Sequence, residues 1–174
     1  PESSAASDVY KRQEIGFTKL EVAQITNFYG MWMTIIGGLF AGLTLHKYGL
    51  VRNMIAGAIF VPLANIPFIF LNILGKDLNF LIFTITVDNF SQGFISVVGI
   101  TFLSNMVSKT YTATQYALLF GLVVIPPNII SSGSGFVVES YGFQNFFILC
   151  ALLGLPAIIF SLLVWRKRSI FGFD

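Results

Sequence analysis

Charged residues are scarce in this chain, and their scarcity excludes an ordinary water-soluble domain. Lys, Arg, Asp and Glu together account for 10% of the 174 residues, whereas a soluble globular domain carries about 25%. The ten basic and eight acidic residues leave a net charge of +2, which is too small to indicate a nucleic-acid partner. Because the chain cannot build a normal solvated surface, we expect membrane lipid around it and no nucleic acid.

Residues that carry out catalysis or hold metals are almost absent as well. The single cysteine, Cys150, has no partner for a disulfide or a Cys-based metal site. The single histidine, His46, has no carboxylate beside it in a suitable arrangement, and the chain contains no phosphate loop, Gly-x-Ser-x-Gly motif or metal-ligand spacing. We therefore expect no enzyme activity, no metal and no cofactor.

Long apolar runs are what the chain has instead. Five of them follow one another, separated by short polar joints, at about 22–45, 51–74, 78–107, 114–138 and 143–165. Each is long enough to cross a bilayer as a helix, which takes ~20 apolar residues. Hydrophobic residues make up 55% of the chain and the mean hydropathy is +0.80. The sequence predicts an all-α protein, a polytopic bundle of five membrane-spanning helices.

The first thirteen residues do not share this apolar character. The stretch from Ser3 to Gln13 resembles the in-frame translation of a transposase adapter used in DNA sequencing libraries. We therefore expect residues 1–13 to be a non-native tail that takes no part in the fold; a natural polar N-terminal tail is the alternative. Native sequence would then begin near Glu14, the membrane domain would cover 14–168, and 169–174 would form a C-terminal tail.

Basic residues predict the orientation of the helices in the membrane. Because the chain crosses at each run, three basic places lie on one side of the membrane: His46 to Arg52, Lys109, and Arg166 to Arg168. Short cytoplasmic loops are enriched in Lys and Arg. The C-terminus is therefore expected in the cytoplasm, and the stretch from Glu14 to Glu21 outside.

Asp88 is the most costly residue to place in a membrane. It lies about ten residues from the outer end of the third run, ~15 Å deep, near the midplane of a ~30 Å hydrocarbon core. Thr84, Asp88, Gln92 and Ser96 recur every four residues and predict one polar stripe, with Asn89 beside it. Intramembrane acids are functional candidates, so we predict that Asp88 carries protons and that Asn89 and Gln92 bind substrate. A structural hydrogen-bond node between helices is the alternative.

Polar and small residues in the other runs extend the candidate site. Pro126 and Pro127 interrupt the fourth run, and a helix broken at mid-membrane depth is typical of transporter sites; close packing is the alternative. Gly38 and Gly42 lie four apart and predict a face where a neighbouring helix approaches closely. The further substrate-binding candidates are Gln115, Asn128, Asn27 and Trp32.

The joint between the first two runs resembles a family motif. The stretch from Gly42 through His46, Lys47 and Gly49 to Arg52 looks like the cytoplasmic loop motif of the major facilitator superfamily, which recurs in both halves of those transporters. It departs from the motif at His46, where the family usually has Asp, and this weakens the case for a gating salt bridge there.

Three further segments carry a closer resemblance. They are 88–93 (Asp-Asn-Phe-Ser-Gln-Gly), 111–119 (Tyr-Thr-Ala-Thr-Gln-Tyr-Ala-Leu-Leu) and 132–147, from Ser132 to Phe147. Together they are similar to the AmpG-type muropeptide permeases and, more distantly, to acetyl-CoA transporters. The resemblance covers about 17–165, and Asp88 stands where relatives often have Glu.

The resemblance implies a fragment of a secondary transporter in the bacterial inner membrane. The five runs would be helices eight to twelve and would form most of the C-terminal half, with the N-terminal half of the same chain as its missing partner. The cargo would be anhydro-muropeptides, sugar–peptide fragments imported for peptidoglycan recycling by symport with protons. The alternatives are a transporter of a CoA ester, sugar or drug, and a membrane protein that binds or signals without transport.

Overall fold

The computed structural model describes residues 24–74, 77–107, 112–132, 140 and 143–166, and within these ranges the chain is helical with no strand. Apart from the single residue 140, the elements in chain order are a π-helical turn η1 (Gln24–Tyr29) and the α-helices α3 (Gly30–Tyr48), α4 (Leu50–Leu74), α5 (Leu78–Met106), α6 (Thr112–Ser132), α8 (Phe143–Leu153) and α9 (Leu155–Arg166). The predicted all-α fold is confirmed. The predicted tail at 1–13, Lys109 and the basic residues after Arg166 lie outside the described residues.

Most of the predicted spans have the length and composition of membrane helices. In the described part of the chain, four stretches are long and apolar enough to cross a bilayer: Ile25–Tyr48, Leu50–Leu71, Leu78–Met106 and Ile148–Arg166. The fourth run forms α6, whose described apolar section, Ala113–Ile125, is shorter than a span. The chain is therefore an integral, multi-pass membrane protein.

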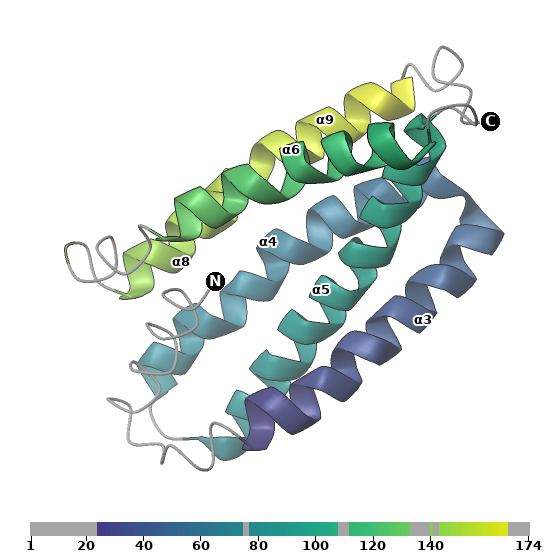
Figure 1. Cartoon of the computed structure of the whole chain (residues 1–174). Helices are drawn as coiled ribbons and strands as arrows, with labels where there is room; N and C mark the ends of the chain where they lie inside the picture. The colour runs from purple at the N-terminus through teal and green to yellow at the C-terminus, as the bar shows by residue number, and fades with distance from the viewer. Residues whose placement is uncertain (1–23, 75–76, 108–111, 133–139, 141–142, 167–174) are drawn as a thin grey trace.

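Helix α5 is the centre of the bundle and packs against both α3 and α4 (Figure 1). Near its start, Leu81 and Ile85 pack against Leu71 of α4. Further along, Phe94 and Val98 meet Ala41 of α3 and Met54 of α4. The ring of Phe94 lies 5.3 Å from that of Phe60 and 6.3 Å from that of Phe40, so one aromatic residue of α5 joins both neighbouring helices.

Two glycines bring the backbones of α3 and α5 into direct contact. A Cβ atom on Gly37 of α3 would overlap the backbone carbonyl of Phe90, and one on Gly93 of α5 would overlap the carbonyl of Thr34. Such backbone contact between membrane helices requires small residues. The predicted pair was partly wrong: Gly38 contacts Val97, but a Cβ on Gly42 would meet nothing within 4 Å, because Gly42 points away from α5.

The predicted break in the fourth run is also wrong. Helix α6 continues through Pro126 and Pro127 to Ser132, as α4 continues through Pro62 and Pro67. Each proline removes one backbone donor, and the bonds on either side hold the helix together.

The interruption lies instead in the fifth run, between α8 and α9. There Pro156 cannot donate to the carbonyl of Leu152, and Gly154 lowers the helix propensity nearby. The carbonyl of Gly154 accepts from the amides of Ala157 at 3.1 Å and Ile158 at 3.3 Å, which restarts the helix.

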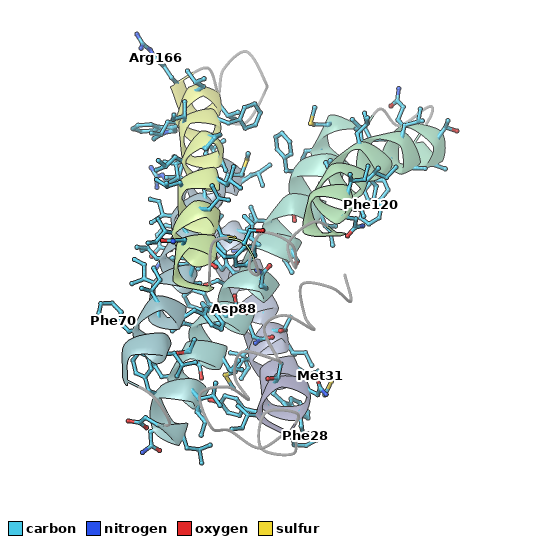
Figure 2. The ribbon with its side chains drawn as sticks, turned by 90° about the vertical axis from the view of Figure 1, so that its left-hand side faces the viewer. Phe28, Met31, Phe70, Asp88, Phe120 and Arg166 are labelled. Atoms are coloured by element: carbon cyan, nitrogen blue, oxygen red, sulfur yellow. The ribbon has the colours of Figure 1, made fainter. Side chains whose placement is uncertain are left out.

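The helices alternate in direction, and α6 departs from the bundle. The α3–α4 joint, the start of α6 and the end of α9 lie at one end of the molecule, and the starts of α5 and α8 lie at the other (Figure 1). Helices α8 and α9 pack on α4 and expose most of their other side chains. Figure 2 shows α6 directed away from α9, and among the described helices its main neighbour is α5. Within the described part of the chain, one side of α5 is therefore left uncovered.

Candidate functional site

The predicted polar stripe runs from the core to the open side of α5. Thr84 is fully buried, Asp88 is half-buried, and Gln92 and Ser96 are exposed. A step of four residues overshoots the 3.6-residue turn by about 40°, so the stripe winds slowly around the helix. Its first member therefore faces the core and its last members face the opening.

Asp88 lies well inside the membrane-spanning part of α5. It follows Leu78 by ten residues, which places it ~15 Å from that end of the helix, and Figure 2 shows it near the middle of the bundle. Asp77 marks that end of α5, because its carboxylate accepts from the amides of Asn79 at 2.9 Å and Phe80 at 3.1 Å as the helix cap. The position of Asp88 at mid-depth is therefore set by its distance from the capped start of α5.

Asn89 belongs to the seam between α3 and α5. Its Nδ2 donates to the carbonyl of Ile85 at 3.0 Å, and its Oδ1 lies 3.2 Å from the hydroxyl of Thr34. That hydroxyl also lies 3.0 Å from the carbonyl of Gly30, so its single proton is shared between two acceptors. The geometry gives Asn89 a role between helices, and binding of substrate by Asn89 stays a prediction.

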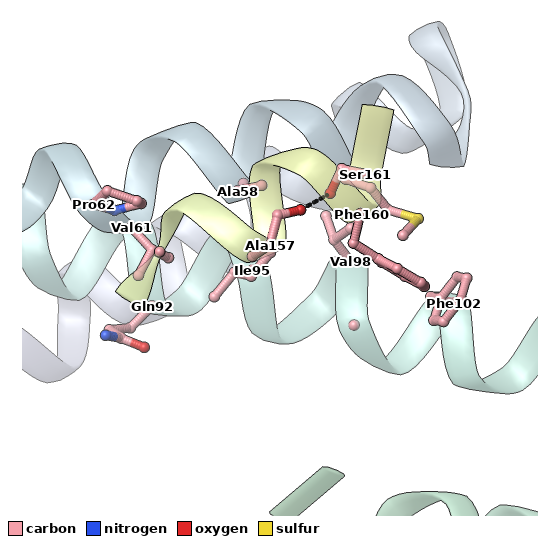
Figure 3. Close-up of a pocket in the computed structure, with 14 residues that line it drawn as sticks. Ala58, Val61, Pro62, Gln92, Ile95, Val98, Phe102, Ala157, Phe160 and Ser161 are labelled. Atoms are coloured by element: carbon pink, nitrogen blue, oxygen red, sulfur yellow. Dashed lines mark hydrogen bonds between the residues drawn. The ribbon is translucent and has the colours of Figure 1, made fainter. Parts of the chain in front are cut away.

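A cavity of about 350 Å³ lies between α4, α5 and α9. Gln92 is at one end and Ser161 towards the other (Figure 3). The Ser161 hydroxyl donates to the carbonyl of Ala157 at 2.8 Å. Among the described side chains that line the cavity, the amide of Gln92 is therefore the main polar group that could bind a ligand. Gln92 therefore stands where the polar stripe meets an apolar space.

The remaining substrate-binding candidates lie on other elements. Gln115 is half-buried near the start of α6 and Asn128 is exposed towards its end. Asn27 is exposed on η1, and Trp32 on α3 exposes 50% of its surface. The described contacts bring Asn89 to α3 and Gln92 to the cavity; the roles of the other four stay predictions.

The loop motif forms a one-residue joint between α3 and α4. Gly49 has a φ of +77°, a conformation that favours glycine, and its amide donates to the carbonyl of Leu45 at 3.0 Å. His46, Lys47 and Arg52 are all exposed at this end, and Gly42 lies one helical turn before His46.

Asn53 completes this joint and was missed by sequence reasoning. It is 3% exposed, and its Nδ2 donates to the carbonyl of Gly49 at 2.7 Å. A polar residue one helical turn after a glycine joint was the available signal.

Thr34 and Tyr29 were missed as well. The hydroxyl of Tyr29 lies 3.0 Å from that of Thr86, in the same seam as Thr34 and Asn89. The signal was present in the spacing of Gly30, Thr34 and Gly37, which are small residues at helical intervals on one face of α3.

Membrane-length helices around a polar stripe at mid-depth are the architecture of a helical membrane transporter. The Major Facilitator Superfamily profile matches residues 3–170, and the chain belongs to that superfamily.

Comparison with curated relatives identifies a more specific similarity within the superfamily. The chain is 31% identical over 157 residues to the protein named "Putative transporter AmpG 4" of Rickettsia felis. This alignment covers 90% of the chain and 38% of that relative. It is also 31% identical over 153 residues to "Putative transporter AmpG 1" of Rickettsia prowazekii, covering 88% of this chain and 34% of the relative. The chain thus spans somewhat more than a third of these relatives, and the resemblance to AmpG-type permeases is confirmed.

Proposed function

We propose that this chain is part of a longer proton-coupled transporter that imports anhydro-muropeptides across the bacterial inner membrane. The observation that carries the proposal is the stripe on α5, which presents Asp88 at mid-depth and Gln92 at the open side of the bundle. An acid at this depth is costly to bury, and intramembrane acids are therefore functional candidates by default. The relatives are named as AmpG transporters, and the cargo is the one that the resemblance to AmpG-type permeases implies.

The two residues would divide the work of coupled import. Asp88 would take up a proton from one side of the membrane and release it to the other, which couples uptake to the proton gradient. Gln92 has an exposed amide that both donates and accepts, as the hydroxyl and amide groups of a sugar–peptide require. The proposed cytoplasmic C-terminus places the exposed cations Lys47, Arg52 and Arg166 at the inner face.

The substitution Asp88→Asn tests the coupling. In the complete transporter it removes the titratable proton and keeps the shape of the side chain. We expect a normal amount of protein in the membrane, loss of gradient-driven accumulation of labelled anhydro-muropeptide by more than about tenfold, and retained exchange across the membrane. Asp88→Glu, which keeps the acid, is the matched control and should retain most accumulation.

Three results would count against the proposal. If Asp88→Asn accumulates cargo like the unmodified transporter, the proton role is wrong. If it fails to reach the membrane whereas Asp88→Glu succeeds, Asp88 is a structural node. If the unmodified transporter accumulates acetyl-CoA, a sugar or a drug in place of the muropeptide, the cargo is wrong and the proton role is tested with that compound.

A further inference from the structure

The seam between α3 and α5 combines two kinds of contact. Gly37 and Gly93 bring the two backbones together, and neither contributes a side chain that interlocks. Hydrogen-bonding side chains lie beside this crossing: Thr34 with Asn89 at 3.2 Å, and Tyr29 with Thr86 at 3.0 Å. A Cβ on Gly30 would come within 3.0 Å of the Asn89 amide, so the backbone of α3 also closes over that side chain.

These two kinds of contact constrain different motions. The glycine contacts set how close the helices come, and the ring of Phe40 against Phe90 and Phe94 gives apolar packing that tolerates small rotations of α5 about its axis. The two hydrogen bonds add a directional constraint on that rotation, because Thr86 and Asn89 are three residues apart and share one face of α5. Asp88 precedes Asn89 by one residue and points about 100° away around the helix. A rotation of α5 that breaks the contact at Asn89 would therefore turn Asp88 and Gln92 as well.

We infer that Thr34 is a positioning residue for the transport site: through Asn89 it helps to hold α5 in the rotation that sets the direction of Asp88 and turns Gln92 to the open side. The inference rests on the proposed function, since it assigns a role within the same site. It also gives Asn89 a different task from the substrate contact that the sequence predicts. Thr34 is assigned no contact with the cargo and acts through Asn89.

The test compares Thr34→Val with Thr34→Ser in the complete transporter. Valine keeps the branched shape of threonine and removes the hydroxyl, whereas serine restores the hydroxyl. We expect Thr34→Val to lower the rate of uptake per molecule by about three- to tenfold, the range expected for one hydrogen bond between membrane helices. Thr34→Ser should return the rate to near that of the parent.

A second measurement reports the rotation of α5 directly. In a Cys150→Ala background, a cysteine at Ser96 lies exposed on the stripe, and one at Ser104 lies exposed near the end of α5. Thr34→Val should change the rate at which a water-soluble thiol reagent labels the cysteine at position 96 by at least about threefold. Thr34→Ser should leave that rate as in the parent, and labelling at position 104 should stay constant throughout.

The outcomes separate this inference from the proposed function. If Thr34→Val matches the parent in both uptake and labelling while Asp88→Asn loses accumulation, the inference is overturned and the proposed function stands. If Asp88→Asn accumulates cargo normally but Thr34→Val still changes labelling at position 96, the proposed function fails and the positioning remains. If Thr34→Val does not reach the membrane, Tyr29→Phe removes the other hydroxyl of the seam. A lower amount of protein with unchanged uptake per molecule in Tyr29→Phe would then overturn the inference.

Discussion

The expected effect of a substitution in this bundle depends on what surrounds the residue. Residues of the same chemistry therefore differ in that effect. Gly93 and Gly42 are both helical glycines, but Gly93 presses against the backbone of Thr34 and Gly42 faces open space. Thr84 and Ser96 belong to one polar stripe, but Thr84 is fully buried and Ser96 is exposed. Predictions at this scale therefore depend on what each side chain meets.

Adding one methyl group at these two glycines should give opposite results. Gly93→Ala must push α3 and α5 apart, because the new Cβ would overlap the carbonyl of Thr34. We expect it to destabilise the purified protein by ~1–3 kcal/mol, the usual cost of overpacking. Gly42→Ala is the matched control and should be neutral or stabilise by up to ~1 kcal/mol, because alanine favours a helix. Unfolding in detergent measures both; equal stabilities would contradict the close crossing.

At the scale of elements, proline alone does not decide where a helix stops. Helices α4 and α6 continue through their prolines. Within the described spans, the helix is interrupted only between α8 and α9, where Gly154 precedes Pro156 by two residues. A proline that lacks a backbone donor and a nearby glycine of low helix propensity together interrupt the hydrogen bonds of the helix. Where only the proline is present, the neighbouring backbone hydrogen bonds keep the helix continuous.

Pro156→Ala should join α8 and α9 into one continuous helix. The alanine amide can donate to the carbonyl of Leu152, so one hydrogen bond of ~1 kcal/mol is gained. We expect backbone amides in 154–158 to exchange with deuterium about fivefold more slowly, as mass spectrometry of the purified protein would detect. The same peptide in a Pro67→Ala variant should exchange at the parent rate. Unchanged exchange in Pro156→Ala would mean that Gly154 alone sets the interruption.

At the scale of the whole molecule, the alternating helices separate two ends, and the described residues give these two ends unequal charge. The end formed by the α3–α4 joint and the end of α9 carries the exposed cations Lys47, Arg52 and Arg166. The opposite end carries the Asp77 cap. Such asymmetry orients helical membrane proteins with the basic end in the cytoplasm.

Cysteine labelling of cells that express the complete transporter tests this orientation. In a Cys150→Ala background, a cysteine at Lys47 should react with a membrane-impermeant maleimide only after the membrane is opened. A cysteine at Asn79, exposed at the other end of the bundle, should react without opening. The reverse pattern would place the C-terminus outside and would overturn the predicted direction of import.

Much of the fold followed from local properties of the chain. Length and hydropathy predicted the membrane helices, because every backbone group in a bilayer must be satisfied within its own segment, and a helix does this locally. The four-residue spacing of Thr84, Asp88, Gln92 and Ser96 predicted one polar stripe, since helical geometry determines which residues share a face. The loop motif predicted a joint at Gly49, where the positive φ favours glycine.

What the sequence by itself determined is the membrane class, most of the helical spans and the polar stripe of α5. Tertiary structure alone decided that Gly37 rather than Gly42 meets α5, that Asn89 turns to Thr34, and that Gln92 opens onto the cavity beside α9. The physical reason is that the face a helix presents to its neighbours depends on its rotation about its own axis. In a chain with apolar residues on every side, packing between helices sets that rotation, and hydropathy does not.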